Sequence, residues 1–313
     1  MVNVAEVTKP RIHNYTYRET LAASEKIGWR VEDIIGGDKR LDFSKPFMPE
    51  SLALVEQLSV LNPDQRRVMN QIRGNTYLSL FGVLEEFILP FVVDHARPQL
   101  SGDDYRVRAF LQFASEEAKH IQLFKRFRED FERGFGSPCG VIGPPDEIAR
   151  EILSHSQLGV GLVILQGEWM TQRHYIESIR DNQDLDPQFK SLLRHHWMEE
   201  AQHAKLDTLM VESLAERRSR EEIESDIDEF LAIVDFLDHG LKEQVELDVD
   251  SLELATGLRF TSVQRDEIVR AQHQANRWTY IGSGLTHPRF LATLDAISPN
   301  ASNRIQQLAP TFC

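Results

Sequence analysis

The chain has 313 residues, of which 41% are hydrophobic and 27% are charged. This ordinary globular composition excludes collagen-like and low-complexity chains, and a chain of this length can bury a large core. The 49 acidic and 35 basic residues give a net charge of −14. So acidic a surface repels phosphate backbones and anionic membranes, and we therefore expect neither nucleic acid nor a membrane as a partner.

Cysteine content and hydropathy limit the compartments and structural classes that we expect for this chain. With only Cys139 and Cys313, the sequence offers neither a disulfide framework nor a thiolate zinc cluster. We find no apolar signal-peptide segment at the N-terminus and no run of about 18 apolar residues. The most apolar segment, residues 77–93, is interrupted by Glu85 and Glu86. We expect a cytoplasmic protein without a membrane span.

Proline, glycine and capping residues divide the chain into long helical segments. Asn62 before Pro63 offers an N-cap followed by proline at the first helical position. Pro90 lies inside this first helix and predicts a kink. Prolines, glycines and acidic first turns mark the other helix ends. The predicted helices cover residues 63–97, 103–133, 146–180 and 187–215, followed by helices at 219–247 and 262–281.

The first four helices have about 30 residues each and therefore span roughly 45 Å. Two of their connections are short and the third has about a dozen residues, while strand signals are weak throughout. This outline predicts an all-α protein built on an antiparallel four-helix bundle with additional flanking helices. We expect a single domain. Residues 1–62 wrap the bundle, 63–215 form its core, and 216–313 add accessory helices.

Acidic residues and histidines interrupt the apolar faces of these helices, which is costly unless the polar groups are paired or bind a metal. On a helical wheel Glu117 lies in the middle of an apolar face, and His120 shares that face. The same spacing recurs at Glu200 and His203, with His196 one turn earlier. The apolar neighbours of the two glutamates are Phe110, Phe113, Ala114, Ile121, Phe124 and Phe131 for the first, and Leu193, Trp197, Ala204 and Val211 for the second.

The remaining two helices each offer one buried acidic position. Glu168 lies among apolar residues of the third helix. In the first helix Glu85 shares its face with Leu78 and Phe81, whereas Glu86 lies on a more polar face. We prefer Glu85 and keep Glu86 as the alternative.

Counted from the helix ends, the four acidic positions lie at similar heights in an antiparallel bundle. One glutamate from each of two helices plus Glu-x-x-His from each of the other two is the ligand set of a carboxylate-bridged di-iron site. Carboxylates neutralise and bridge two iron ions, and imidazoles supply nitrogen donors suited to iron. Ion pairs within the bundle are the structural alternative.

Other polar residues near the motifs have more than one interpretation. His196 is either a ligand or a core histidine behind the ligands. We expect Glu116, Glu199 and Asp207 to lie behind the ligands or at the surface rather than to be ligands. Carboxylates behind metal-bound histidines fix the tautomer of the ring. His195 points to the opposite side of its helix and is expected at the surface.

These motifs resemble the ferritin-like di-iron superfamily over residues 63–215, on the segments LEEF, SEEAKH, QGEW and MEEAQH. The extra histidine one turn before the second Glu-x-x-His is similar to the p-aminobenzoate N-oxygenase family. Those enzymes use three histidines and four carboxylates to activate dioxygen and oxygenate an arylamine nitrogen. The resemblance implies the metal ligands Glu85 (or Glu86), Glu117, His120, Glu168, His196, Glu200 and His203.

Two related groups fit less well. The ribonucleotide reductase small subunit carries a radical tyrosine one turn after the first histidine, where this chain has Phe124. The segment QFASEEAKH is also similar to the reductase-like ligand-binding oxidases, but their crosslinking tyrosine would fall near Val163. Both departures favour an oxygenase that acts on a diffusible substrate.

We therefore expect a non-haem di-iron monooxygenase that activates O2 and acts on a small organic substrate, with N-oxygenation of an arylamine implied by the resemblance. The expected cofactor is two iron ions, with manganese or a mixed centre left open. Electrons come from an external donor, because no flavin, nicotinamide or iron–sulfur motif is present. We also expect a homodimer. The alternatives are a ferritin-like iron-binding or iron-oxidising protein and an oxidase like the ribonucleotide reductase small subunit.

The substrate is expected to enter beside the bundle. The aromatic side chains that could cover it there are equally suited to a core position. They are Trp169, Trp197, Phe113 and Phe124.

Overall fold

Residues 13–313, which the computed structural model describes, fold almost entirely into helices. Within this range no β-strand forms, and one isolated bridge joins Gly36 to Lys39. The prediction of an all-α protein is therefore confirmed. The prediction of a single domain with three segments stays a prediction.

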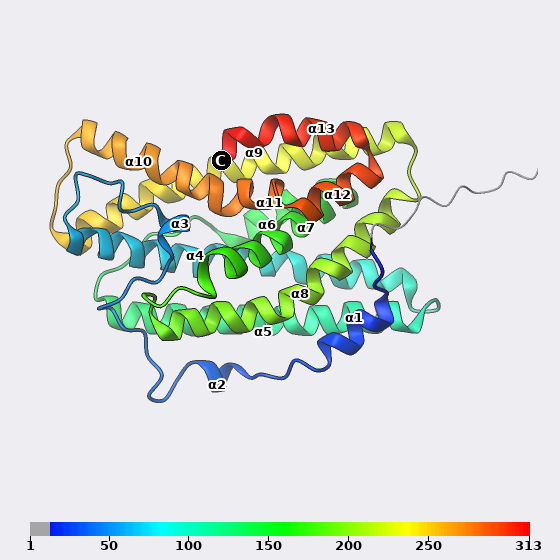
Figure 1. Cartoon of the computed structure of the whole chain (residues 1–313), viewed down its shortest axis with the longest axis horizontal. Helices are drawn as coiled ribbons and strands as arrows, with labels where there is room; N and C mark the ends of the chain where they lie inside the picture. The colour runs from blue at the N-terminus through cyan, green and yellow to red at the C-terminus, as the bar shows by residue number, and fades with distance from the viewer. Residues whose placement is uncertain (1–12) are drawn as a thin grey trace, which may run out of the picture.

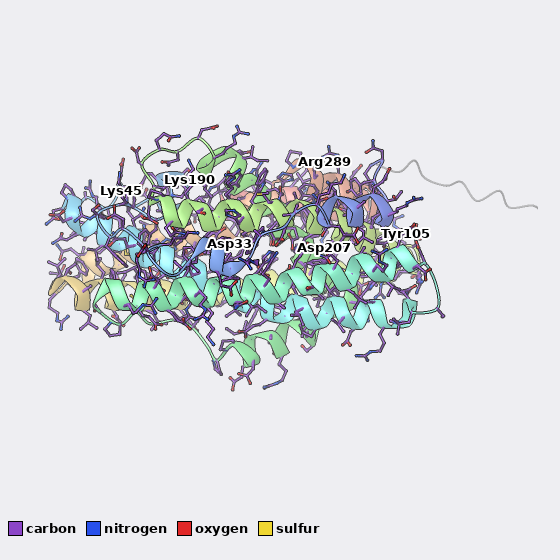
Figure 2. The ribbon with its side chains drawn as sticks, turned by 90° about the horizontal axis from the view of Figure 1, so that it is seen from below. Asp33, Lys45, Tyr105, Lys190, Asp207 and Arg289 are labelled. Carbon is purple, nitrogen blue, oxygen red and sulfur yellow. The ribbon has the colours of Figure 1, made fainter. Side chains whose placement is uncertain are left out.

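Four long helices form the bundle (Figure 1). α4 packs on α5, and α7 packs on α8. Seen from below, α5 and α8 run side by side along the long axis (Figure 2). The four helices are α4 (Pro63–Ala96), α5 (Asp104–Phe135), α7 (Gln157–Arg173) and α8 (Pro187–Ala215).

Local capping chemistry sets the ends of these helices. The side chain of Asn62 accepts a hydrogen bond from the backbone N–H of Gln65, whose side chain accepts one in return from the backbone of Asn62. This reciprocal pair satisfies two N–H groups that a helix start otherwise leaves unpaired. At the start of α8 the side chain of Asp186 accepts a single hydrogen bond from the backbone N–H of Phe189. Gly136, with φ of 78°, ends α5. α4 continues through Pro90 to Ala96.

The helix predicted over residues 146–180 is wrong as a single element. It is divided into α6 (Pro145–Leu153) and α7, and α7 passes into a π-helical turn at His174–Ile179. At the break two serines offer the backbone other partners, and His155 between them pairs with the distant Glu229. Ser154 donates its hydroxyl hydrogen to the carbonyl of Glu151 at 2.7 Å, and Ser156 accepts from the N–H of Gly159 at 3.1 Å.

α1 (Tyr17–Ser24) and α2 (Val31–Ile34) lie along one edge of the bundle, and the C-terminal helices cover the opposite edge (Figure 1). α3 (Glu50–Ala53) lies on that C-terminal side, where it packs on α10. The C-terminal part comprises α9 (Arg220–Thr256), α10 (Ser262–Arg277) with a π-helical turn at Trp278–Gly282, α11 (Ser283–Leu285), α12 (Pro288–Ile297) and α13 (Pro299–Leu308), and 3-10 turns lie at Arg97–Gln99 and Ala309–Phe312.

α9 is longer than the predicted 219–247. The additional turns bury Val249 and Leu252 fully in the core, and Gly257, with φ of 70°, ends the helix. α9 packs on α7, α4 and α10. It therefore covers the bundle face that α7 would otherwise expose.

By length and composition alone, the helical stretch 63–99 is apolar enough to cross a membrane, with a mean hydropathy of 1.6 over its most apolar window. Half of that window is buried inside the protein, as in the core helix of a bundle.

Because α11 packs closely on α7, adding one methyl group at Gly284 should lower the stability of the protein. A Cβ at Gly284 would lie 2.5 Å from the carbonyl oxygen of Gln166, whereas a Cβ at Gly82, within α4, has nothing within 4 Å. We expect Gly284→Ala to lower the free energy of unfolding by about 1–3 kcal/mol. Gly82→Ala should raise it by about 0.5–1 kcal/mol, because alanine is the better helix former. Equal effects of the two variants in chemical denaturation would contradict the packing described.

Candidate metal centre

The four bundle helices bring seven acidic and histidine side chains together in the core. Every one of them is at most 3% exposed. We call this group the acid–histidine cluster. It consists of Glu85 from α4, Glu117 and His120 from α5, Glu168 from α7, and His196, Glu200 and His203 from α8. Six of the seven form two overlapping sets, in each of which four ligand atoms lie within 4.8 Å of one another.

The first set comprises Glu85, His120, His196 and Glu200. Nε2 of His196 lies 2.9 Å from Oε1 of Glu85 and 3.0 Å from Oε1 of Glu200. Nδ1 of His120 lies 3.3 Å from Oε2 of Glu85 and 3.1 Å from Oε1 of Glu200. Two carboxylates and two imidazoles therefore face one point.

The second set comprises Glu117, His120, Glu200 and His203. Nδ1 of His203 lies 2.8 Å from Oε1 of Glu117 and 3.4 Å from Oε1 of Glu200. His120 and Glu200 belong to both sets, and Oε1 of Glu200 faces all three histidines. Glu200 thus occupies the position that a bridging carboxylate needs.

Glu168 lies beside these sets and belongs to neither. It is 3% exposed, and its Oε2 has no hydrogen-bond partner. Burial, together with the neighbouring charge of Glu200, raises the pKa of Glu168 well above its usual value. The structure thus places Glu168 next to Glu200, and its role as a ligand stays a prediction.

Several buried atoms of the cluster face one another at close range without forming a well-oriented hydrogen bond. They include both carboxylate oxygens of Glu117, Oε1 of Glu200 and Nδ1 of His203, the last of which lies 2.8 Å from Oε1 of Glu117. Buried polar atoms without partners are rare, because each one costs about 1–3 kcal/mol. Metal ions would satisfy these carboxylate oxygens and imidazole nitrogens together. The donor set of the cluster therefore fits two metal ions of the first transition row.

When no metal is bound, the crowded carboxylates cause the cluster to bind protons at neutral pH, and we call this property the proton store. Burial and the charge of Glu85 raise the pKa of Glu117 well above its usual value. Burial alone would lower the pKa values of His120 and His203. The negative charges of nearby carboxylates outweigh this effect and raise both pKa values well above normal. Glu85 has the largest raising effect on His120, and Glu200 on His203. At neutral pH the metal-free cluster therefore holds protons that metal ions would displace.

Two further carboxylates orient the histidines from behind. Oε2 of Glu199 accepts from Nε2 of His120 at 2.8 Å, and Oε2 of Glu116 accepts from Nε2 of His203 at 2.9 Å. A proton held at Nε2 leaves Nδ1 of each ring free for a metal. Glu116 and Glu199 therefore lie behind the histidines as partners. Asp207 is also fully buried, but both of its carboxylate oxygens lack a hydrogen-bond partner, so its expected partner role stays a prediction.

Sequence reasoning missed the residues that hold these outer carboxylates. The Ser24 hydroxyl donates to Oε1 of Glu116 at 2.5 Å, and Lys119 pairs with Glu199. The ring of Trp29 stacks on His120 with centroids 6.0 Å apart. Ser24 and Trp29 come from the N-terminal segment, which has no sequence pattern linking it to the cluster.

Aromatic rings close the cluster against water. Phe113 stacks on His203 with ring centroids 3.9 Å apart. Phe81 and Phe124 pack edge-on against His196, with ring centroids 5.5 and 5.0 Å from that of the histidine. Phe124 occupies the place where a radical tyrosine would lie, one turn after His120.

The structure decides two further sequence-based choices. Glu85 is buried and belongs to the cluster, while Glu86 is exposed, so the structure brings the preferred glutamate to the site and not its alternative. His196 faces the cluster with its Nε2 and belongs to the first set, as a ligand would. His195 is half-buried rather than fully at the surface, because the ring of Trp29 packs edge-on against it with centroids 5.8 Å apart.

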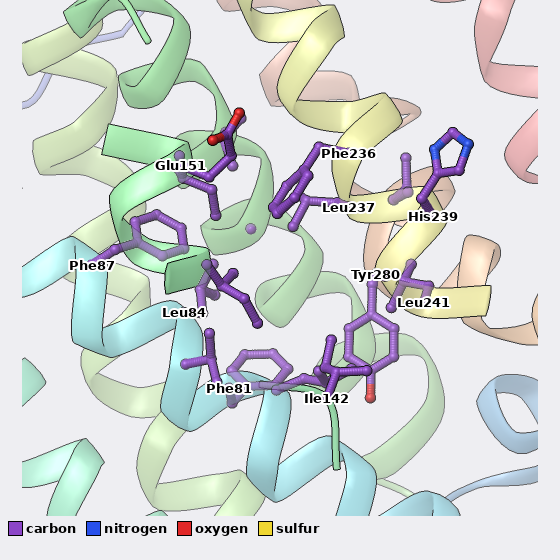
Figure 3. Close-up of a pocket in the computed structure, with 18 of the residues that line it drawn as sticks. Phe81, Leu84, Phe87, Ile142, Glu151, Phe236, Leu237, His239, Leu241 and Tyr280 are labelled. Atoms are coloured by element: carbon purple, nitrogen blue, oxygen red, sulfur yellow. The ribbon is translucent and has the colours of Figure 1, made fainter. Parts of the chain in front are cut away.

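A cavity of about 440 Å³ lies beside the cluster, between α4, α6, α7 and α9 (Figure 3). Its walls include Leu84 and Gly167, which directly precede Glu85 and Glu168 in the chain. Phe81 lines the cavity and also touches His196. The cavity thus reaches the helical turns that carry the cluster.

None of the four aromatic residues expected near the substrate lines this cavity. Phe113 and Phe124 are core residues against the histidines, and the place of substrate entry stays a prediction. The sequence could not reveal this cavity, because α6 and α9 form much of its wall and their positions on the bundle depend on tertiary contacts.

Comparisons with known proteins give little beyond general shape. Neither a protein-family model nor a curated protein matches the chain. Among solved structures, an R2-like ligand-binding oxidase variant with an anaerobically reconstituted Mn/Fe cofactor matches at 14% identity and a TM-score of 0.45, over 94% of this chain and 93% of that one. A second variant, with an aerobically reconstituted Fe/Fe cofactor, matches at 15% identity and a TM-score of 0.42, over 84% and 92%. Similarity at this level assigns no role to any residue of this chain.

Adjacent glutamates in α4 give a matched test of the metal centre. We expect Glu85→Gln to weaken binding of Fe2+ or Mn2+ by more than about tenfold, because an anionic donor is lost from the first set. Glu86→Gln removes the same charge from an exposed position and should bind metal as the unmodified chain does. Metal analysis after anaerobic loading and desalting measures the difference, and equal metal content in the two variants would rule out Glu85 as a ligand.

Metal binding should release protons and strengthen with pH. The raised pKa values of Glu117, His120 and His203 mean that the metal-free cluster binds protons more tightly than the unfolded chain. Their stabilisation of the metal-free fold is therefore lost as pH rises through those pKa values. Loading the protein with Mn2+ in weak buffer should release protons to an indicator dye, and affinity should be higher at pH 8 than at pH 6. A pH-independent affinity without proton release would contradict the proton store.

Proposed function

We propose that this protein is an O2-activating di-metal oxidoreductase that acts on a small organic molecule held in the cavity beside the acid–histidine cluster. The observation that carries the proposal is the pair of ligand sets sharing His120 and Glu200, with buried donor atoms that have no other partner. When bound, two metal ions of this kind supply the redox chemistry that dioxygen activation requires.

The residues of this chain have separate parts in that activity. Glu199 and Glu116 hold protons at Nε2 of the histidines, so the rings keep one orientation. The aromatic residues around the histidines exclude water from the cluster. The cavity holds a substrate against Phe81 and Leu84, next to the turn that carries Glu85. Reducing equivalents come from an external donor.

Within this class, oxygen transfer to the nitrogen of an arylamine is the finer proposal. It is supported by the resemblance at the three histidines, which the structure brings together in one cluster. Iron oxidation for storage is the competing activity, and it would need no organic substrate.

The reaction with dioxygen tests the proposed function. Protein loaded anaerobically with Fe2+ is mixed with O2 and aniline, while O2 consumption and organic products are measured. We expect uptake that depends on the loaded metal, is faster with aniline than without, and yields an oxygenated arylamine. Glu200→Gln should lose at least about tenfold in rate, since it removes a donor shared by both sets. Glu86→Gln is the control.

Two results would contradict the proposal. Metal-loaded protein that does not consume O2 would exclude oxidoreductase chemistry at the cluster. Continued uptake of iron beyond the two sites, with ferric mineral as product and no effect of aniline, would identify an iron-storage protein instead.

A further inference from the structure

The cavity described above is apolar in its depth. Phe81, Phe87 and Val163 line it and are each at most 2% exposed to solvent. Tyr280 turns its ring toward the cavity, whereas its hydroxyl points away (Figure 3). These walls suit a hydrocarbon or aromatic body and offer no charged partner for the buried end of a ligand.

The mouth of the cavity is acidic. Glu147 and Glu151 on α6 and Glu243 on α9 line it, and all three are exposed. None of the three carboxylates makes an ion pair within residues 13–313. No lysine or arginine is among the lining residues, and the one histidine, His239, donates instead to the backbone carbonyl of Asp235 at 2.8 Å.

We infer that the cavity binds an apolar molecule that carries a protonated amine, with the apolar body inside and the ammonium group at the mouth among Glu147, Glu151 and Glu243. The inference rests on the proposed function, because only that function makes the molecule in the cavity a substrate. It goes further in stating the charge of the substrate and its direction in the cavity. It places oxidation at the end of the molecule remote from the amine, and so stands as an alternative to oxygenation of an arylamine nitrogen.

Charge complementarity decides between ligand types of equal size. Three unpaired carboxylates attract an ammonium group and repel a carboxylate, and both effects weaken as salt increases. An aliphatic amine, whose pKa is near 10 as in lysine, is fully protonated at neutral pH. In this orientation the end of the molecule remote from the amine lies against Phe81 and Leu84, the part of the wall nearest to the cluster.

Three probes with one body test the inference. Phenylbutylamine, phenylbutanol and phenylbutyrate differ only in the charge of their head group. Each is titrated calorimetrically into the metal-loaded protein without oxygen, at low and at physiological salt. We expect the amine to bind at least about tenfold more tightly than the alcohol, the carboxylate to bind most weakly, and the preference for the amine to shrink as salt increases.

Variants locate the binding. The triple variant Glu147→Gln, Glu151→Gln, Glu243→Gln should bind the amine about tenfold more weakly and leave the alcohol unchanged. The control, Glu32→Gln, Asp184→Asn, Asp266→Asn, removes the same charge from exposed positions outside the cavity and should change neither. Leu237→Trp, which fills the cavity from α9, should abolish binding of both probes.

The inference is overturned if phenylbutyrate or the alcohol binds as tightly as the amine. It is also overturned if both triple variants weaken the amine equally, or if Leu237→Trp leaves its affinity intact, because the amine would then bind elsewhere on the acidic surface. Calorimetry without oxygen is independent of turnover. Selective amine binding in a protein that does not react with O2 would thus refute the proposed function alone, and turnover without amine preference would refute only the inference.

Discussion

The burial of four carboxylates and three histidines in one apolar core is the constraint on which the rest of the structure depends. Without a metal, such a cluster must hold protons and leave several oxygens without hydrogen bonds, as Glu117 does. Both conditions are costly in a low-dielectric interior. The cluster concentrates this cost at one level of the bundle, where each of the four helices contributes at least one donor.

The surroundings of the cluster make sense as devices that keep the donors oriented. The carboxylates of Glu116 and Glu199 fix the outer nitrogens of two histidines, and Ser24 and Lys119 fix these carboxylates in turn. The N-terminal segment thereby becomes part of the metal centre rather than a mere covering. On the opposite side α6 and α9 leave a cavity that meets the bundle where Glu85 and Glu168 are carried. The N-terminal side of the bundle thus orients the histidines, and the side with α6 and α9 gives a substrate access to the cluster.

Much of this could be predicted from the sequence, since it depends on local chemistry. The cap at Asn62, the start of α8 at Pro187 and the choice of Glu85 over Glu86 all follow from residues within a few turns of one another. The apolar stripes placed Glu117 and Glu200 in the core because a helical wheel needs no tertiary information.

What could not be predicted depends on contacts between distant segments. The break between α6 and α7 coincides with the pairing of His155 with Glu229, 74 residues away. Ser24 reaches Glu116 across 92 residues, and the cavity needs α9, whose position on the bundle has no signature in the motifs. Sequence patterns thus identified the donors, whereas the structure alone showed what holds them and where a substrate has room.

Anomalous diffraction from crystals of protein loaded with Fe2+ tests the central claim most directly. The account predicts two iron peaks, roughly 3.5–4 Å apart, inside the bundle. Nδ1 of His120 and of His203 should be ligands, as should Nε2 of His196, with Glu200 shared between the ions. A single peak on exposed carboxylates, or none within the bundle, would contradict it.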